Sequence, residues 1–169
     1  QKTQFFRSYF TLKLNGQATD KRVLSSGKKS VGGVGTVRGY TLAEIAGDMG
    51  YNASIDYTIP FPNPIKLFKD FPTLDQILSF NIFLDHGKVF TRDKLTLESA
   101  DDEISGFGAG ATLNIPKKEN KYPGFSFAIS YAHPMPDSDV PARSTGAFGA
   151  SVPYLYPRGT IYLSGMTHY

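Results

Sequence analysis

The sequence has no cysteine and no tryptophan, and only three of its 169 residues are methionine. Without cysteine, the chain can form no disulfide framework, no thiolate metal site and no cysteine nucleophile. It also has no run of about 18 apolar residues, which excludes a membrane-spanning helix. Histidine is scarce, and His86, His133 and His168 lack the spacing of metal ligands. We therefore expect neither a metal ion nor a cofactor.

The sequence also lacks a strongly basic patch and a catalytic motif. Its net charge is +3, but the basic residues are scattered, and the doublets at 28–29 and 117–118 have no interleaved aromatic stripe. Nucleic-acid binding is therefore not expected. Serine, histidine and aspartate occur without a nucleophile elbow, so we do not expect an enzyme. The acidic run 101–103 is predicted to be a loop tip, and it lacks the spacing of an EF-hand calcium site.

Aromatic residues, glycine and proline are abundant instead, with 10 Tyr, 13 Phe, 17 Gly and 11 Pro. This composition favours an all-β chain with many turns. Apolar and polar residues alternate in six segments, which predicts a strand in each. The predicted strands cover residues 5–17, 51–59, 77–90, 104–115, 125–133 and 160–169. Residues 65–76 are predicted to be a connection with a short helical turn, and the alternation within 148–156 is compatible with a further hairpin.

Strands of about ten residues with one apolar face are typical of an antiparallel transmembrane β-barrel in the outer membrane. A soluble β-sandwich shows the same alternation. We favour the barrel because the polar faces carry few Lys and Glu, aromatic residues gather at strand ends, and the chain ends on Tyr169. The residues predicted to face lipid are Ile55, Tyr57, Phe80, Ile82, Phe127 and Ile129. Those predicted to face the lumen are Asp56, Asn81, Asp85 and Ser130.

The stretch from Ser30 to Gly50 is rich in glycine, which suits a flexible surface loop. It is also rich in apolar residues, which solvated linkers avoid. These are Val31, Val34, Val37, Tyr40, Leu42 and Ile45. We therefore expect the loop to pack against another surface, and an arginine packed there, Arg38, needs an acidic partner.

The order of these parts resembles the C-terminal end of two-partner secretion transporters, which are outer-membrane proteins of the BamA superfamily. The V-R-G-Y sequence of Val37, Arg38, Gly39 and Tyr40 resembles the superfamily's marker in its long sixth extracellular loop. The F-x-D-x-G sequence of Phe83, Asp85 and Gly87 resembles its companion motif on a following strand. The resemblance implies that the loop, residues 18–50, folds into the lumen and that Arg38 meets Asp85 there.

The resemblance also implies a sixteen-stranded barrel preceded by periplasmic POTRA domains. Residues 1–169 would then be the C-terminal part of the barrel, with its last six strands. Since the smallest such barrels have eight strands, we expect the chain to need the remainder of its barrel to close. The last predicted strand departs from the usual pattern, because Gly165 and Thr167 stand where larger apolar residues are expected.

The predicted function is an integral outer-membrane pore that secretes a partner polypeptide. Two alternatives stay open from the sequence: an assembly factor of the same superfamily that inserts other barrels, and a barrel that anchors a patatin-like surface enzyme. The sequence preceding Gln1 would distinguish them, because the enzyme would bring a G-x-S-x-G motif ahead of any POTRA domains. The expected partners are outer-membrane lipid, a secreted or inserted polypeptide, the remainder of the barrel and the POTRA domains.

Overall fold

The computed structural model describes residues 8–66, 68, 71–92, 101–117, 123–135 and 159–168. Within these residues, one antiparallel sheet contains six long strands. They are β1 (Tyr9–Gln17), β4 (Met49–Pro60), β5 (Leu78–Phe90), β6 (Asp101–Ile115), β7 (Gly124–Pro134) and β8 (Thr160–His168).

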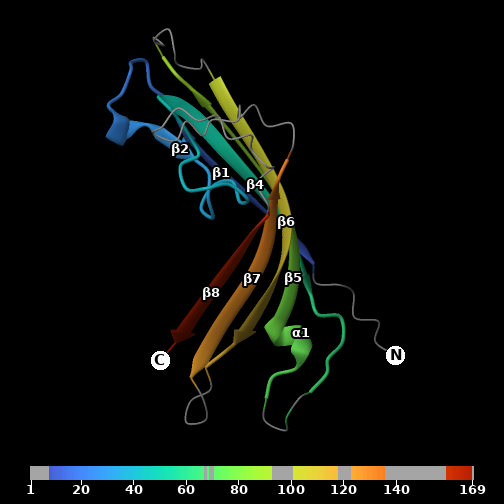
Figure 1. Cartoon of the computed structure of the whole chain (residues 1–169). Helices are drawn as coiled ribbons and strands as arrows, with labels where there is room; N and C mark the ends of the chain where they lie inside the picture. The colour runs from blue at the N-terminus through green and yellow to red at the C-terminus, as the bar shows by residue number, and fades with distance from the viewer. Residues whose placement is uncertain are drawn as a thin grey trace, which may run out of the picture.

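The six strands lie side by side in chain order and form a twisted, curved sheet (Figure 1). In the described part of the chain, β1 and β8 are its edges, and the sheet is not closed between them. The antiparallel all-β architecture was predicted. The alternating patterns located each strand to within a few residues, because one face of every strand is apolar.

Four short elements complete the described fold. The segment between β1 and β4 contains a 3-10 helix (Ser25–Gly27) and the paired strands β2 (Lys29–Val31) and β3 (Ile45–Gly47). The helix α1 (Leu74–Ile77) precedes β5 and lies at the opposite end of the sheet (Figure 1). It begins inside the connection predicted to hold a helical turn. None of the described helices is long and apolar enough to cross a membrane.

Several predicted strand boundaries need correction. Strand β4 begins at Met49, so it takes the last two residues of the predicted loop 18–50. Ile77 belongs to α1, where it is buried, rather than to β5. The predicted hairpin at 148–156, the start of the first strand at 5–7 and the terminal Tyr169 lie outside the described residues.

The acidic run 101–103 is part of strand β6, so its prediction as a loop tip was wrong. Asp101 and Glu103 pair in register with Phe90 and Lys88 of β5. The Lys88 ammonium lies 3.0 Å from a carboxylate oxygen of both Asp101 and Glu103. Lys88 on the neighbouring strand thus balances the negative charge of Asp101 and Glu103, so these acidic residues can pair within the sheet.

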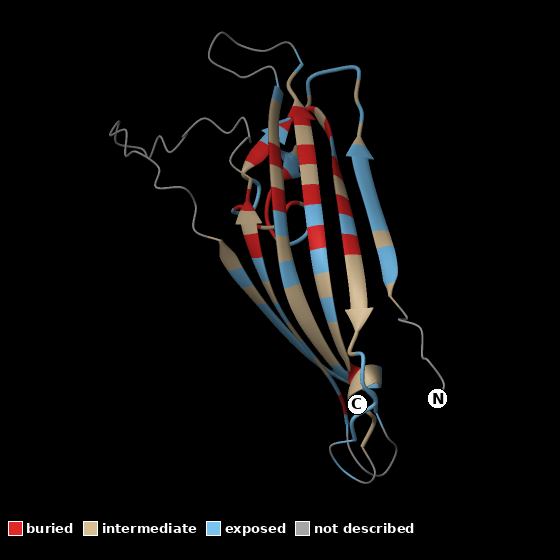
Figure 2. Cartoon of the chain, turned by 90° about the vertical axis from the view of Figure 1, so that its right-hand side faces the viewer, coloured by how far each residue is buried: buried red, intermediate tan, exposed pale blue. Residues whose placement is uncertain are grey.

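The two faces of the sheet differ in a way that does not fit a soluble sandwich. The apolar rows of one face are exposed, although a sandwich would bury them against a second sheet. The exposed residues include Phe10, Leu12, Leu14, Ile55, Phe80, Ile82, Leu84, Phe107, Phe127, Ile129, Ile161 and Leu163. The opposite face buries polar groups instead, among them Asn52, Ser54, Asp56 and Asp85. Buried positions concentrate toward one end of the strands (Figure 2).

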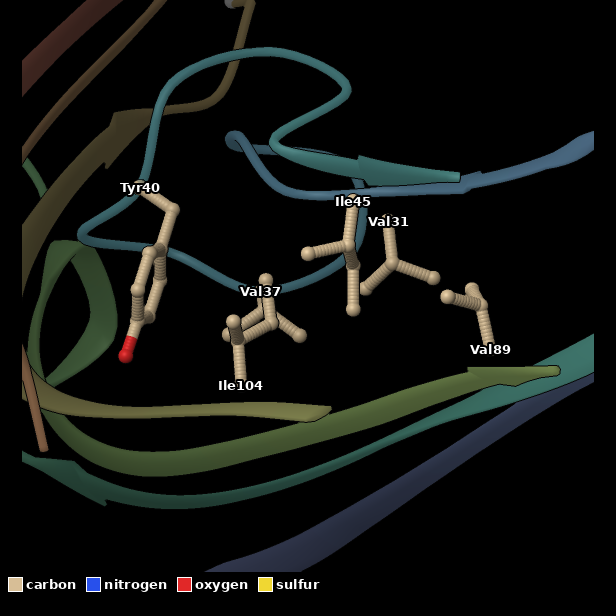
Figure 3. Packing of buried hydrophobic residues seen from close by; sticks show 6 residues of the cluster. All are labelled: Val31, Val37, Tyr40, Ile45, Val89 and Ile104. Atoms are coloured by element: carbon tan, nitrogen blue, oxygen red, sulfur yellow. The ribbon is translucent and has the colours of Figure 1, made fainter. Parts of the chain in front are cut away.

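The apolar core lies where the glycine-rich segment packs on this polar face. Val31, Val37, Tyr40 and Ile45 of the segment form one cluster with Val89 of β5 and Ile104 of β6 (Figure 3). Val31, Val37 and Ile104 have no exposed surface. Burying each aliphatic side chain contributes about 1.5–3 kcal/mol. This packing excludes a fully solvated surface loop for residues 31–45, but Val34 and Leu42, which were also expected to pack, are 66% and 84% exposed.

Candidate functional site

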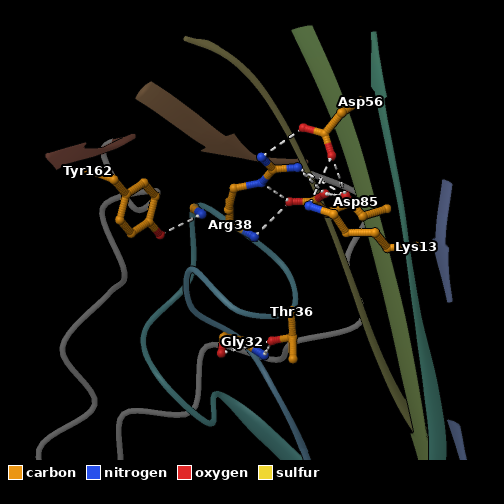
Figure 4. A network of polar contacts seen from close by, with 9 residues as sticks. Lys13, Gly32, Thr36, Arg38, Asp56, Asp85 and Tyr162 are labelled. Carbon is orange, nitrogen blue, oxygen red and sulfur yellow. Dashed lines mark hydrogen bonds and ion pairs between the residues drawn. The ribbon is translucent and has the colours of Figure 1, made fainter. Parts of the chain in front are cut away.

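The polar site is built by β4 and β5 together with the loop tip, Val37–Tyr40. Ser54 of β4 is the register partner of Asp85 of β5, and Asp56 is the partner of Phe83. Since directly opposite and diagonal positions of one face lie within side-chain reach, the register gathers Ser54, Asp56 and Asp85. The loop tip brings Arg38 onto this group (Figure 4).

Arg38 donates two parallel hydrogen bonds to the Asp85 carboxylate. Its Nε donates to Oδ2 and its Nη2 donates to Oδ1, each over 2.7 Å. The backbone N–H of Arg38 also donates to Asp85 Oδ2, over 3.0 Å. The Asp85 side chain is completely buried, whereas the Arg38 side chain is 15% exposed. Two-pronged recognition of a carboxylate is specific to guanidinium, so lysine could not reproduce this contact.

Arg38 also makes direct hydrogen bonds to Asp56 and Ser54. Arg38 Nη1 donates to Asp56 Oδ1 over 3.1 Å, and Nη2 donates to the Ser54 hydroxyl over 3.0 Å. The Ser54 hydroxyl donates to Asp85 Oδ1 over 2.7 Å. Lys13 of β1 lies 3.8 Å from Asp56, so two cations balance two carboxylates. The sequence placed Asp56 on the polar face, but only the register makes it a partner of Arg38.

Arg38 remains charged in this setting. Burial lowers its pKa, but hydrogen bonds and charge attraction from Asp85 and Asp56 outweigh burial and raise the pKa above its ordinary value. A buried cation is tolerated only when it is paired and hydrogen-bonded. The site meets that condition, because all three guanidinium nitrogens donate hydrogen bonds.

The Phe83 ring packs against the face of the Arg38 guanidinium. The Arg38 Cζ lies 3.4 Å from the centre of the Phe83 ring, which is a cation–π contact. The ring occupies the space over Gly108, its register partner on β6, where a Cβ would come within 2.4 Å of it. Phe83, the first residue of the F-x-D-x-G motif, therefore forms the apolar surface against which the Arg38 guanidinium packs.

Gly39 and Tyr40 hold the tip against the next strands. Gly39 has a φ of +100°, and a Cβ there would lie 3.0 Å from the backbone nitrogen of Pro134 on β7. Its N–H donates to the Tyr162 hydroxyl of β8 over 3.0 Å. Tyr40 is buried, and its hydroxyl donates to the carbonyl of Ser105 on β6 over 2.9 Å. The three successive residues 38–40 thus contact the strands from β4 to β8.

Val37 and Gly87 form the apolar side of the same docking contact. Val37 is fully buried, and Gly87 lies beneath it on β5. A Cβ on Gly87 would approach Val31 Cγ1 to 2.5 Å and Val37 Cγ2 to 3.2 Å. Because Gly87, the last residue of the F-x-D-x-G motif, has no side chain, Val31 and Val37 of the loop can pack directly against the backbone of β5.

Asp48 forms a second polar centre that the sequence did not predict. It has no exposed surface, and its two carboxylate oxygens accept the backbone N–H of Val23 (3.0 Å) and of Arg92 (2.8 Å). The hydrogen bond from Val23 lowers the pKa of Asp48, and the bond from Arg92 adds to this against the effect of burial. Gln17 of β1 donates to the Asp48 carbonyl, over 3.2 Å. Asp48 therefore joins the start of the loop to the segment that follows β5.

Comparison with known protein families gives a match to the first two thirds of the chain. A family model described as haemolysin secretion/activation protein ShlB/FhaC/HecB matches residues 1–113. This range includes the loop tip and the F-x-D-x-G motif. The chain belongs to this family. ShlB/FhaC/HecB proteins are integral outer-membrane β-barrels that secrete a partner haemolysin or adhesin, and they are not enzymes. No curated protein and no solved structure gave a significant match.

Family membership confirms several predictions from the sequence. The resemblance to two-partner secretion transporters was correct, as were the outer-membrane location and the absence of enzymatic function. Among the three predicted functions, secretion of a partner protein is the one that the family supports.

Strands β7 and β8 lie beyond the matched residues. In the described part of the chain, no group of three or more acidic or histidine side chains is arranged for a metal ion.

Proposed function

We propose that residues 18–50 occupy the lumen of the secretion pore and that Arg38, held by Asp85, anchors them there. We call this contact the lumen lock; it comprises Val37, Arg38, Gly39, Tyr40, Phe83, Asp85 and Gly87. The observation that carries the proposal is the two-pronged bond between Arg38 and the fully buried Asp85. It lies on the face opposite the exposed apolar rows, which is the lumen side of an outer-membrane barrel.

The same proposal places the sheet in a larger barrel, as the last six of sixteen strands, preceded by POTRA domains. The open edges of β1 and β8 support this, because unpaired backbone groups cost several kcal/mol each in lipid. The exposed apolar rows would then contact outer-membrane lipid. The edges would pair with further strands of the same barrel.

In this function, the lock holds the loop until the partner polypeptide passes. A chain in transit needs the space that the loop tip occupies, so the contacts of Arg38 must open or shift. Breaking a buried ion pair by removing one partner costs about 3–5 kcal/mol. Removing either Arg38 or Asp85 would leave the other charge buried without this partner, so each single variant should undock the loop tip.

The test is a double-mutant cycle in the complete transporter. Arg38→Ala and Asp85→Ala should each reduce secretion of the partner protein and expose the loop to added protease. The double variant should be no worse than the worse single variant, because the second change removes a partner already lost. Arg38→Lys should restore little, since an ammonium has no guanidinium fork.

The matched control is Lys21→Ala, which removes a cation from an exposed position of the same loop. It should leave secretion and protease resistance unchanged. If the effects of Arg38→Ala and Asp85→Ala simply add, or if Lys21→Ala matches them, the lumen lock is wrong.

A further inference from the structure

The loop tip is bonded to the edge strand β8 as well as to the strands that carry its acidic partners. Gly39 lies between the ion-paired Arg38 and the buried Tyr40, and its backbone N–H donates to the Tyr162 hydroxyl over 3.0 Å (Figure 4). Tyr162 is separated from Gly39 by 123 positions in the sequence. It lies beyond residues 1–113, so the family pattern does not single it out.

Tyr162 reaches the tip because of its place on β8. Its neighbours Ile161 and Leu163 are 63% and 65% exposed on the outer face, whereas Tyr162 is half-buried on the loop side. Its register partner on β7 is Ser130, a position predicted to face the lumen. Alternation along the strand thus points one aromatic ring inward at the level of the loop tip.

The backbone of the tip is shaped for this contact. The positive φ of Gly39 and its closeness to Pro134 leave no room for a side chain between the tip and β7. With the Cα side of Gly39 against β7, its N–H points to β8 and meets the Tyr162 hydroxyl. A phenol hydroxyl on a long, rigid side chain is a suitable acceptor across that gap.

We propose that Tyr162 is a positioning residue that latches the loop tip to β8, so that the loop is released from the edge strand when the pore opens. The inference rests on the proposed lumen lock and deepens it. Arg38 fixes the tip to β4 and β5 through charge, whereas Tyr162 fixes it to β8 through a neutral hydrogen bond. The neutral bond is the weaker of the two, so the tip leaves β8 first.

The experiment replaces one hydroxyl group in the complete transporter. Tyr162→Phe keeps the ring and removes the acceptor, so the pore should open more often in planar bilayers by roughly two- to tenfold, which corresponds to one neutral hydrogen bond. Tyr131→Phe is the matched control: it removes the same hydroxyl from an exposed tyrosine on the outer face of the neighbouring strand β7. That variant should open like the unmodified transporter.

A merely structural role of Tyr162 would give a different result. It would lower the amount of heat-modifiable transporter in the membrane without changing the opening frequency of each assembled pore. That outcome overturns the latch. As a second measurement, a photoreactive phenylalanine analogue at position 162 should cross-link to the peptide that contains Gly39, and the same analogue at position 131 should not. Failure of the cross-link at 162 also overturns it.

Arg38→Ala in the same bilayers separates this inference from the lock itself. If Arg38→Ala increases opening and Tyr162→Phe does not, the latch is wrong and the lumen lock stands. If neither variant increases opening, both are wrong. An increase in both, with Tyr131→Phe unchanged, supports the latch.

Discussion

At the scale of single residues, Asp48 shows how one buried carboxylate can hold distant parts of the chain. Each of its oxygens accepts a backbone N–H, one from Val23 in the loop and one from Arg92 after β5. Both donors are main-chain groups, so no pairing of charged side chains in the sequence predicts the contact. The pKa of Asp48 is lowered from its ordinary value of 3.8.

This lowered pKa predicts the direction of a pH effect. A carboxylate whose pKa is lower in the folded state stabilises that state above its unfolded pKa, and the contribution is lost as the pH falls through the folded pKa. Hydrogen exchange at Val23 and Arg92 should therefore stay slow from pH 7 to near pH 4 and become faster below the folded pKa. The measurement is exchange of the two peptides in the complete transporter, corrected for intrinsic rates.

Asp48→Asn should speed exchange at neutral pH and remove the acid-dependent step, because an amide has one accepting oxygen in place of two. Asp20→Asn, at an exposed position of the same loop, is the control and should behave like the unmodified protein. An acid-dependent step that persists in Asp48→Asn would assign it to another group.

At the scale of elements, the loop between β1 and β4 is a docked hairpin. Its arms pair as β2 and β3, and its apolar side chains pack on β5 and β6. Lys29 of β2 donates to Asn52 of β4 over 2.9 Å, which adds a polar contact to the apolar ones. One close approach is at Gly87, where a Cβ would come within 2.5 Å of Val31 Cγ1, so the space for a side chain is already filled.

Gly87→Ala should therefore weaken the docking of the loop. The new Cβ would meet the buried and β-branched Val31, which has little freedom to move, and overpacking of this kind costs about 1–3 kcal/mol. Protease accessibility of the loop in intact cells should increase, together with a loss of secretion. Gly165→Ala on β8 is the control, because the nearest heavy atom to its Cβ lies at 3.9 Å. Equal effects of both substitutions would contradict this account.

The sequence predicted the long strands better than the loop. Alternation is a local signal, so it located β4 to β8 with errors of one to three residues. The pairing of β2 with β3 carries no such signal, because three residues in each arm are too few to show a period. Arg38 and Asp85 were identified through a motif. Asp56, Asp48 and Tyr162 depend on register and on the path of the loop, which a single sequence does not encode locally.

At the scale of the whole molecule, the two faces of the sheet predict which positions meet water. Adjacent residues of one strand should differ, because Ile82 and Ile129 belong to the exposed apolar rows, whereas Asn81 and Ser130 belong to the opposite face. Single cysteines at Asn81 and Ser130 should react in membranes with an impermeant thiol reagent. Single cysteines at Ile82 and Ile129 should not.

The described chain suits this measurement, because it has no cysteine of its own. Denaturation in detergent is the control and should make all four positions reactive. Equal labelling of both sets in intact membranes would contradict the assignment of lipid and lumen faces to this sheet.

Strand β6 has glycine at three successive positions of its inner face, Gly106, Gly108 and Gly110. Glycine-rich strands specify their pairing weakly and are prone to slip. A slip of two residues would move β6 by about 6.6 Å relative to a neighbouring strand, and contacts such as the 2.9 Å hydrogen bond from the Tyr40 hydroxyl to the Ser105 carbonyl of β6 would not survive it. Because the loop tip contacts β5, β6 and β8 at once, it can dock only when these three strands are in register, and a sheet with a slipped strand would be left with an undocked loop.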